Sequence, residues 1–128
     1  MLLAGLVLSG IAALIHVLIF RMESLTWTRE STRRTFGTTA QEAEATREMA
    51  FNQGFYNLFL AIAVAVGIIL VAAGQLAVGA ALVLTGAGSM AAAATVLALS
   101  SPDKRGAALK QGAAPALGVI ALVIGLIL

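Results

Sequence analysis

Residues 51–101 read FNQGFYNLFLAIAVAVGIILVAAGQLAVGAALVLTGAGSMAAAATVLALSS and contain no Asp, Glu, Lys, Arg or His. A helix needs about 20 consecutive apolar residues to cross a bilayer. This stretch is therefore long enough for two crossings, provided that a tight turn joins them. Gly74 and Gln75 lie near its middle and mark the natural position of that turn.

Two further apolar stretches flank this pair. Residues 1–20 contain one titratable side chain, His16, and residues 111–128 contain none. The composition, 60% hydrophobic and 11% charged, differs from that of soluble proteins, in which about 25% of residues are charged. We expect an all-α integral membrane protein whose residues 1–128 form a single four-transmembrane-helix domain. The spans are expected at about 2–25, 48–73, 76–99 and 111–128, with loops at 26–39 and 100–110.

The basic residues predict how these spans are oriented. All eight Lys and Arg fall in the first and third connections, and the middle connection has none. Cytoplasmic loops carry an excess of Lys and Arg, and spans in alternating direction place the first and third connections on the same side. The sequence therefore predicts an antiparallel bundle with cytoplasmic loops and both termini extracytoplasmic. The basic residues are Arg21, Arg29, Arg33, Arg34 and Arg47, then Lys104, Arg105 and Lys110.

Charge and composition also exclude several classes of function. The net charge of +2 arises in the third connection and suits contact with anionic lipid headgroups, so we expect no nucleic acid partner. The chain has no cysteine, which excludes disulfides, thiolate metal sites and thiol nucleophiles. His16 alone is too little for a metal site, which needs three or four ligands, and we expect no cofactor. Abundant Ala and Gly, with Arg favoured over Lys, indicate a GC-rich bacterial genome. Together with the apolar spans, this leads us to expect a multi-pass protein of the bacterial inner (plasma) membrane.

The first span is expected to carry its polar side chains on one face. His16, Phe20, Glu23 and Trp27 follow in steps of three and four residues, and they share a face if the helix persists that far. Trp27, the only tryptophan, lies where the helix leaves the membrane, the usual position of an interfacial anchor.

The next elements can be bounded from local signals. Thr39 with Glu42 three residues later predicts a capping box at the start of a helix. No proline interrupts residues Ala40–Ala73, so we expect one long helix whose first two turns extend beyond the membrane. The last span is expected to begin near Gln111, with Pro115 in about its first turn, where proline is best tolerated.

Most polar residues of the spans gather at the ends that we expect to be cytoplasmic, and the opposite halves are almost purely apolar. This arrangement predicts a polar pocket in the cytoplasmic half of the bundle, with Glu23 at its mouth. Interhelical hydrogen bonding explains such residues equally well, and a buried His16 also has a packing role as an alternative. The expected ligand-binding residues are His16, Glu23, Asn52, Gln53, Tyr56, Asn57 and Gln111.

The same residues carry a resemblance to a known family. The pattern His16-Val-Leu-Ile-Phe20 with Glu23, the block NQGFYNLFLA at residues 52–61, and Gln111 with Pro115-Ala116 resemble the bacterial integral-membrane family catalogued as domain of unknown function 1304. The resemblance spans nearly the whole chain. It implies a compact multi-span membrane protein without an established activity.

Three functional hypotheses remain open from the sequence. The first is a non-enzymatic ligand-binding or transport-related bundle in the lipid bilayer, with a small-molecule ligand and His16 as its protonatable element. The second is an accessory subunit of a larger membrane complex or a homo-oligomer. The third is a membrane enzyme, an isomerase or hydrolase with His16 as acid and base, although one strong base is few for such a mechanism.

Overall fold

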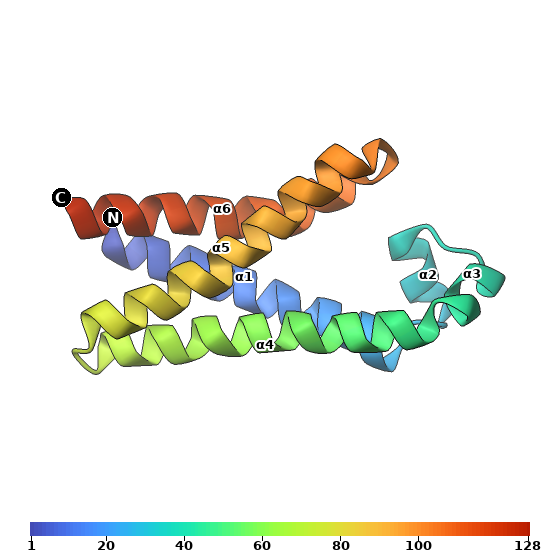
Figure 1. Ribbon diagram of the computed structural model, residues 1–128, viewed down its shortest axis with the longest axis horizontal. Helices are drawn as coiled ribbons and strands as arrows, with labels where there is room; N and C mark the ends of the chain where they lie inside the picture. Colours follow the sequence, from blue (N-terminus) through green and yellow to red (C-terminus); the bar gives the residue numbers. More distant parts are fainter.

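The computed structural model describes all residues from Met1 to Leu128, and every regular element is helical (Figure 1). In chain order these are α1 (Leu2–Phe20), the π-helix η1 (Arg21–Leu25), α2 (Glu30–Phe36), α3 (Ala40–Ala45), α4 (Arg47–Ala72), α5 (Leu76–Ser100), the 3-10 helix η2 (Pro102–Lys104) and α6 (Arg105–Ile127).

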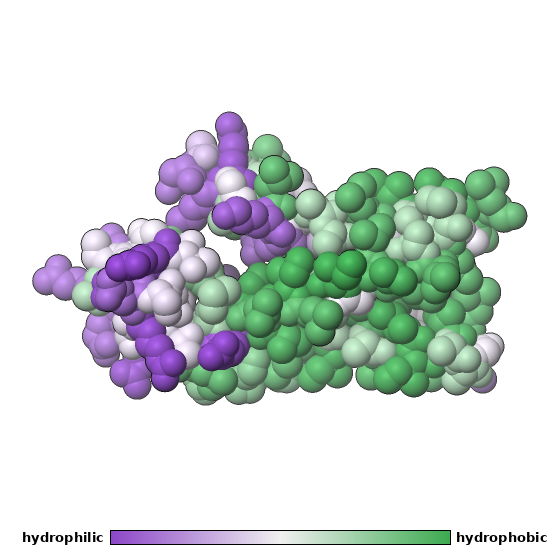
Figure 2. All heavy atoms as spheres, turned by 180° about the vertical axis from the view of Figure 1, so that it is seen from behind, coloured by the Kyte–Doolittle hydropathy of each residue, from purple (hydrophilic) through white to green (hydrophobic).

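Four helices are long and apolar enough to cross a membrane. These segments are Leu2–Leu25, Arg47–Ala72, Leu76–Ser100 and Pro102–Ile127. Figure 2 shows the same division on the surface, where hydrophobic side chains cover the body of the molecule and hydrophilic ones gather at one end. The prediction of four apolar helices long enough to span a bilayer is confirmed.

The four long helices form a ring in which each packs against two neighbours. α1 packs against α4 and α6, and α5 packs against the same two helices. Both termini lie at the end of the molecule that also holds the turn between α4 and α5, and α2 and α3 lie at the other end (Figure 1). At that second end the pair α5 and α6 diverges from the pair α1 and α4 (Figure 1).

Small residues bring α4 and α5 into close contact. A Cβ atom added at Gly79 would lie 2.6 Å from the Gly67 carbonyl oxygen and 2.7 Å from the Val71 nitrogen, so only glycine fits this crossing. The chain reverses just before it at Gly74, whose φ of 85° lies in the left-handed region that favours glycine. Close packing of this kind takes the place of the hydrophobic effect between helices in lipid.

The hydrophobic core of the bundle is a cluster of buried side chains from α1, α4 and α5. Its members are Ala12, Ala13, Ala61, Val64, Ala87 and Met90.

The structure differs from the sequence prediction on either side of α3. The expected single helix over Ala40–Ala73 is broken at Thr46, because this residue leaves the helical conformation at φ −103° and ψ 4°. Its hydroxyl donates to the Glu42 carbonyl oxygen (2.7 Å) and accepts a hydrogen bond from Trp27 Nε1 (3.1 Å). The expected loop 26–39 also contains a short helix, α2.

The last helix begins six residues earlier than expected. α6 starts at Arg105 instead of Gln111, so part of the expected loop 100–110 is helical. Arg105 Nε donates to the Ala98 carbonyl oxygen (3.0 Å) and so satisfies one of the free carbonyls at the end of α5. Pro115 consequently lies inside the helix and not in its first turn. Prolines inside spans are tolerated where neighbouring helices cover the freed backbone groups, and Pro115 is buried.

Candidate functional site

The candidate site is built on the π-helix at the end of α1. The backbone N–H of Thr26 donates to the Arg21 carbonyl oxygen (3.1 Å), five residues back, which defines the wider π turn. Such π turns within helices are rare and are found frequently at functional sites. Glu23 lies in this turn, and only 7% of its surface is exposed.

Glu23 is held by a residue of α4. Asn57 Nδ2 donates to Glu23 Oε2 (2.8 Å) and also to the carbonyl oxygen of Gln53 (3.2 Å). Nothing in the chain donates to the other carboxylate oxygen, Oε1. A carboxylate that is buried with neutral partners alone carries an uncompensated charge, which is costly in a medium of low dielectric constant.

Gly54 allows α4 to approach η1 this closely. A Cβ atom at this position would overlap Ser24 Oγ and would lie 3.1 Å from the Phe20 carbonyl oxygen. Ser24 Oγ instead donates to the Phe51 carbonyl oxygen (2.8 Å). The rings of Phe20 and Phe55 pack edge-on, with 5.1 Å between their centroids, and add an apolar contact between the end of α1 and α4.

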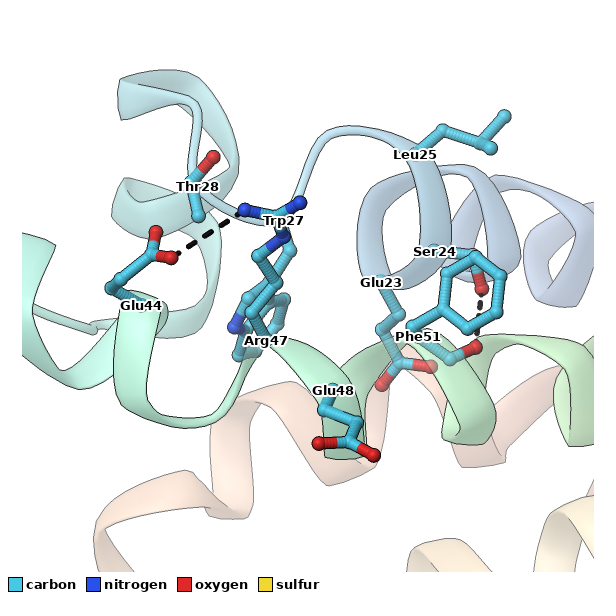
Figure 3. A pocket seen from close by; sticks show the side chains of 9 residues that line it. All are labelled: Glu23, Ser24, Leu25, Trp27, Thr28, Glu44, Arg47, Glu48 and Phe51. Atoms are coloured by element: carbon cyan, nitrogen blue, oxygen red, sulfur yellow. Dashed lines mark hydrogen bonds and ion pairs between the residues drawn. The ribbon is translucent and has the colours of Figure 1, made fainter.

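A cavity of about 660 Å³ opens next to Glu23, between η1, α3 and the first turns of α4 (Figure 3). Glu44 and Arg47 form an ion pair in it (3.4 Å), and both side chains are largely exposed. Arg47 is the only cation that lines the cavity, so Glu23 and Glu48 remain without an ion-pair partner. The lining residues are Glu23, Ser24, Leu25, Trp27, Thr28, Glu44, Arg47, Glu48 and Phe51.

Trp27, in the loop between η1 and α2, lines one side of this cavity. Its indole packs edge-on against Phe36, with 5.0 Å between ring centroids, and its Nε1 donates to Thr46. The helix ends before Trp27, because Thr26 leaves the helical conformation at φ −131°. The first helix thus ends at Leu25, as expected from the sequence, and the condition under which Trp27 would share a face with His16, Phe20 and Glu23 is not met.

His16 lies apart from this cavity. It is 3% exposed, and its Nδ1 donates to the Ala12 carbonyl oxygen (2.9 Å) one turn earlier in α1. No hydrogen bond joins His16 to Glu23, Asn57 or any other polar side chain.

The remaining predicted residues are distributed over the surface of the bundle. Asn52 is exposed and donates to the Glu48 carbonyl oxygen (3.0 Å) of its own helix. Gln53 is also exposed, Tyr56 has 69% of its surface exposed, and Gln111 is half-buried on α6. Of the seven residues proposed from the sequence, the structure joins Glu23 and Asn57 by a direct hydrogen bond, and Glu23 is buried instead of lying at a mouth.

Several lining residues were not among the predicted site residues. Glu48 and Phe51 lie three residues apart on α4, and for Trp27 the sequence predicts only an interfacial anchor. The sequence signal that points to them is the change from charged to apolar residues between Glu48 and Phe51, at the same boundary where Trp27 lies. No three His, Asp or Glu side chains cluster closely enough to ligate a metal ion.

Fold and site together define a class of protein. Four helices long and apolar enough to cross a membrane, with a charged helical segment at one end, are the architecture of a multi-pass membrane protein. The chain belongs to the family described as Protein of unknown function (DUF1304), whose model matches residues 10–123. This match confirms the resemblance found in the sequence. No curated protein and no solved structure matches the chain.

Proposed function

We propose that this protein binds a small organic cation in the cavity beside Glu23. In this proposal it is a single four-helix antiparallel bundle of the bacterial inner membrane. The charged ends of the spans face the cytoplasm and both termini lie outside, because all Lys and Arg residues lie in the first and third connections or in the parts of the spans that adjoin them. The cavity is then reached from the cytoplasmic side. The buried Glu23 carboxylate that lines it is the observation that carries the proposal.

Charge selects the ligand class. The cavity is lined by three carboxylates and one guanidinium, and the guanidinium of Arg47 is paired with Glu44. Glu23 and Glu48 therefore leave two negative charges in a partly enclosed space. A bound cation compensates the charge of Glu23, which no side chain of the protein does.

Size and surface chemistry favour an organic cation over a bare metal ion. A volume of about 660 Å³ lies within the range of small-molecule sites, about 300–1,000 Å³. Trp27 and Phe51 add aromatic surface to the lining. An ammonium group over an aromatic ring gains about 0.5–2 kcal/mol, most with tryptophan, so the lining offers both charge and aromatic contacts to an alkylammonium ion.

The fluorescence of Trp27 provides the test, because this is the only tryptophan and it lines the cavity. Purified protein in detergent is titrated with three probes of similar shape. These are the cation choline, its uncharged isostere with a tert-butyl group in place of trimethylammonium, and the anion 3,3-dimethylbutanoate (the conjugate base of tert-butylacetic acid). We expect a saturable change with choline and binding at least about tenfold weaker for the other two, a difference of about 1.4 kcal/mol or more.

Variants locate the binding. Glu23→Gln retains an acceptor for Asn57 and is expected to weaken choline binding about tenfold, and the exposed Glu48→Gln about two- to threefold. Asp103→Asn removes one negative charge outside the cavity and serves as the matched control with unchanged affinity. Equal binding of all three probes, or equal effects of Glu23→Gln and Asp103→Asn, would contradict the proposal.

The orientation has its own test, since the natural chain has no cysteine. Gln41→Cys in α3 and Gln75→Cys in the turn between α4 and α5 place single exposed thiols at opposite ends of the molecule. In spheroplasts we expect a membrane-impermeant maleimide to label position 75 directly and position 41 only after permeabilisation. The reverse labelling pattern would overturn the proposed topology.

A further inference from the structure

A second cavity lies on the same stretch of chain and has the opposite character. Its volume is about 300 Å³, and no carboxylate lines it. Two arginines, Arg21 and Arg29, contribute the charge, and four hydroxyl side chains contribute hydrogen-bonding groups. The lining residues are Leu18, Arg21, Met22, Thr26, Arg29, Ser31, Thr32 and Thr35.

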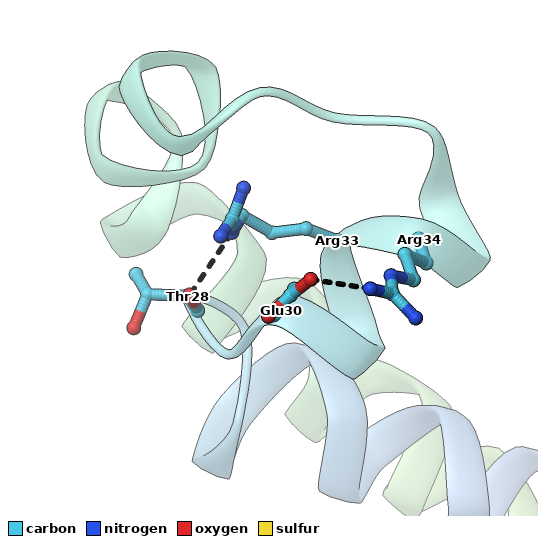
Figure 4. Close-up of polar contacts among 4 residues, drawn as sticks. All are labelled: Thr28, Glu30, Arg33 and Arg34. Carbon is cyan, nitrogen blue, oxygen red and sulfur yellow. Dashed lines mark hydrogen bonds and ion pairs between the residues drawn. The ribbon is translucent and has the colours of Figure 1, made fainter.

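The two arginines of this cavity have no partner within the protein. Neither the Arg21 nor the Arg29 guanidinium makes an ion pair or a hydrogen bond. The neighbouring arginines differ: Arg34 pairs with Glu30 one turn away, and Arg33 Nε donates to the Thr28 carbonyl oxygen at 3.2 Å (Figure 4). The same short segment thus contains two internally satisfied arginines and two free ones that line one cavity.

This chemistry suits a phosphate group. Guanidinium groups bind phosphate oxygens through paired, charge-assisted hydrogen bonds, and hydroxyl groups add donors around them. The hydroxyl groups of Thr26 and Thr32 already contact each other (3.0 Å), and the Thr35 hydroxyl donates to the Ser31 carbonyl oxygen (3.1 Å). The exposed Ser31 hydroxyl therefore remains as a free donor to a phosphate oxygen beside the two guanidinium groups.

The apolar part of the lining identifies the source of that phosphate. Leu18 and Met22 belong to the first candidate membrane span, and Leu18 has 57% of its surface exposed. The cavity therefore continues from two arginines onto a surface that faces acyl chains in a bilayer. We propose that Arg21 and Arg29 bind the phosphate of a membrane phospholipid whose acyl chains lie along Leu18 and Met22.

The phospholipid site is separate from the cation cavity. The two cavities share no lining residue: η1 contributes Glu23, Ser24 and Leu25 to the first, and Arg21 and Met22 to the second. Variants of the two arginines therefore leave the choline-binding residues in place, and the two proposals are tested independently.

Native mass spectrometry of the purified protein tests this site with three probes. These are phosphatidylglycerol, the corresponding diacylglycerol without a phosphate, and inorganic phosphate. We expect a bound phosphatidylglycerol, little diacylglycerol, and no displacement of the lipid by millimolar inorganic phosphate. The Arg21→Gln/Arg29→Gln variant is expected to bind phosphatidylglycerol about 25-fold more weakly, about fivefold for each arginine.

The matched control is Arg33→Gln/Arg34→Gln, which removes the same charge from the same segment but from outside the cavity. It is expected to change phosphatidylglycerol affinity less than threefold. Equal losses in the two double variants would show a general attraction between charges and would overturn the site. Displacement of the lipid by inorganic phosphate, or equal binding of diacylglycerol, would overturn the assignment of a phospholipid.

Discussion

Replacing Gly79 with alanine tests the packing that holds α4 against α5. The added Cβ would lie 2.6 Å from the Gly67 carbonyl oxygen and 2.7 Å from the Val71 nitrogen. Both are backbone atoms, so no change of side-chain rotamer relieves the contact, and the two helices must move apart. Overpacking of this kind costs about 1–3 kcal/mol.

Gly88→Ala is the matched control on the same helix. A Cβ at Gly88 meets no atom within 4 Å. Both substitutions gain the same helix propensity, up to about 1 kcal/mol, so this gain cancels when the two variants are compared. Their free energies of unfolding should therefore differ by about 1–3 kcal/mol, with Gly79→Ala the less stable.

The difference can be measured by unfolding in mixed micelles of mild detergent and SDS, followed by far-ultraviolet circular dichroism and by Trp27 fluorescence. For each variant we compare the SDS fraction at the unfolding midpoint and the free energy of unfolding extrapolated to zero SDS. Equal stability of Gly79→Ala and Gly88→Ala, or greater stability of Gly79→Ala, would refute the reasoning that backbone contact at this crossing determines the fit.

Three further predictions concern the polar contacts. Asn57→Leu removes the donor to a buried carboxylate and should lower the free energy of unfolding by about 1–3 kcal/mol. The double variant Glu23→Leu/Asn57→Leu should recover most of this loss in the same SDS titration, and a double variant no more stable than Asn57→Leu would contradict the pairing. Thr39→Ala removes the capping box and should cost about 0.5–2 kcal/mol locally, seen as faster amide hydrogen exchange in α3 with unchanged protection of the spans. Arg34→Gln breaks an exposed ion pair with Glu30 and should change the unfolding free energy by less than about 1 kcal/mol, so a larger loss would contradict its assignment as a surface pair.

The long helices could be predicted from the sequence because a bilayer imposes a minimum apolar length. The uncharged stretch 51–101 fixed two of them, and the capping box at Thr39 was recognised because Glu42 follows at the required spacing and is confirmed in the structure. The sequence predicts the start of the last helix six residues too late, because a helix can begin among charged residues that precede its apolar part. Residues Arg105–Lys110 form helical turns where the sequence predicts a loop.

The site was less predictable, since it depends on contacts between elements distant in the sequence. The change from α-helical to π-helical hydrogen bonding at Arg21 has no marker in composition, and it decides how Glu23 faces α4. At the break at Thr46, the hydroxyl group accepts a hydrogen bond from Trp27, nineteen positions earlier. Neither contact follows from the periodicity of a single helix.

Because of the π turn, the orientation of Glu23 towards Asn57 depends on the number of residues in η1 as much as on their identity. Each residue of an α-helix turns the chain by about 100°, and a π turn accommodates one residue more than an α turn does. Deleting Met22 would let an uninterrupted α-helix run to the same loop, but it would rotate the following carboxylate away from Asn57. Every remaining side chain would be unchanged, and yet the acidic cavity would lose its buried charge.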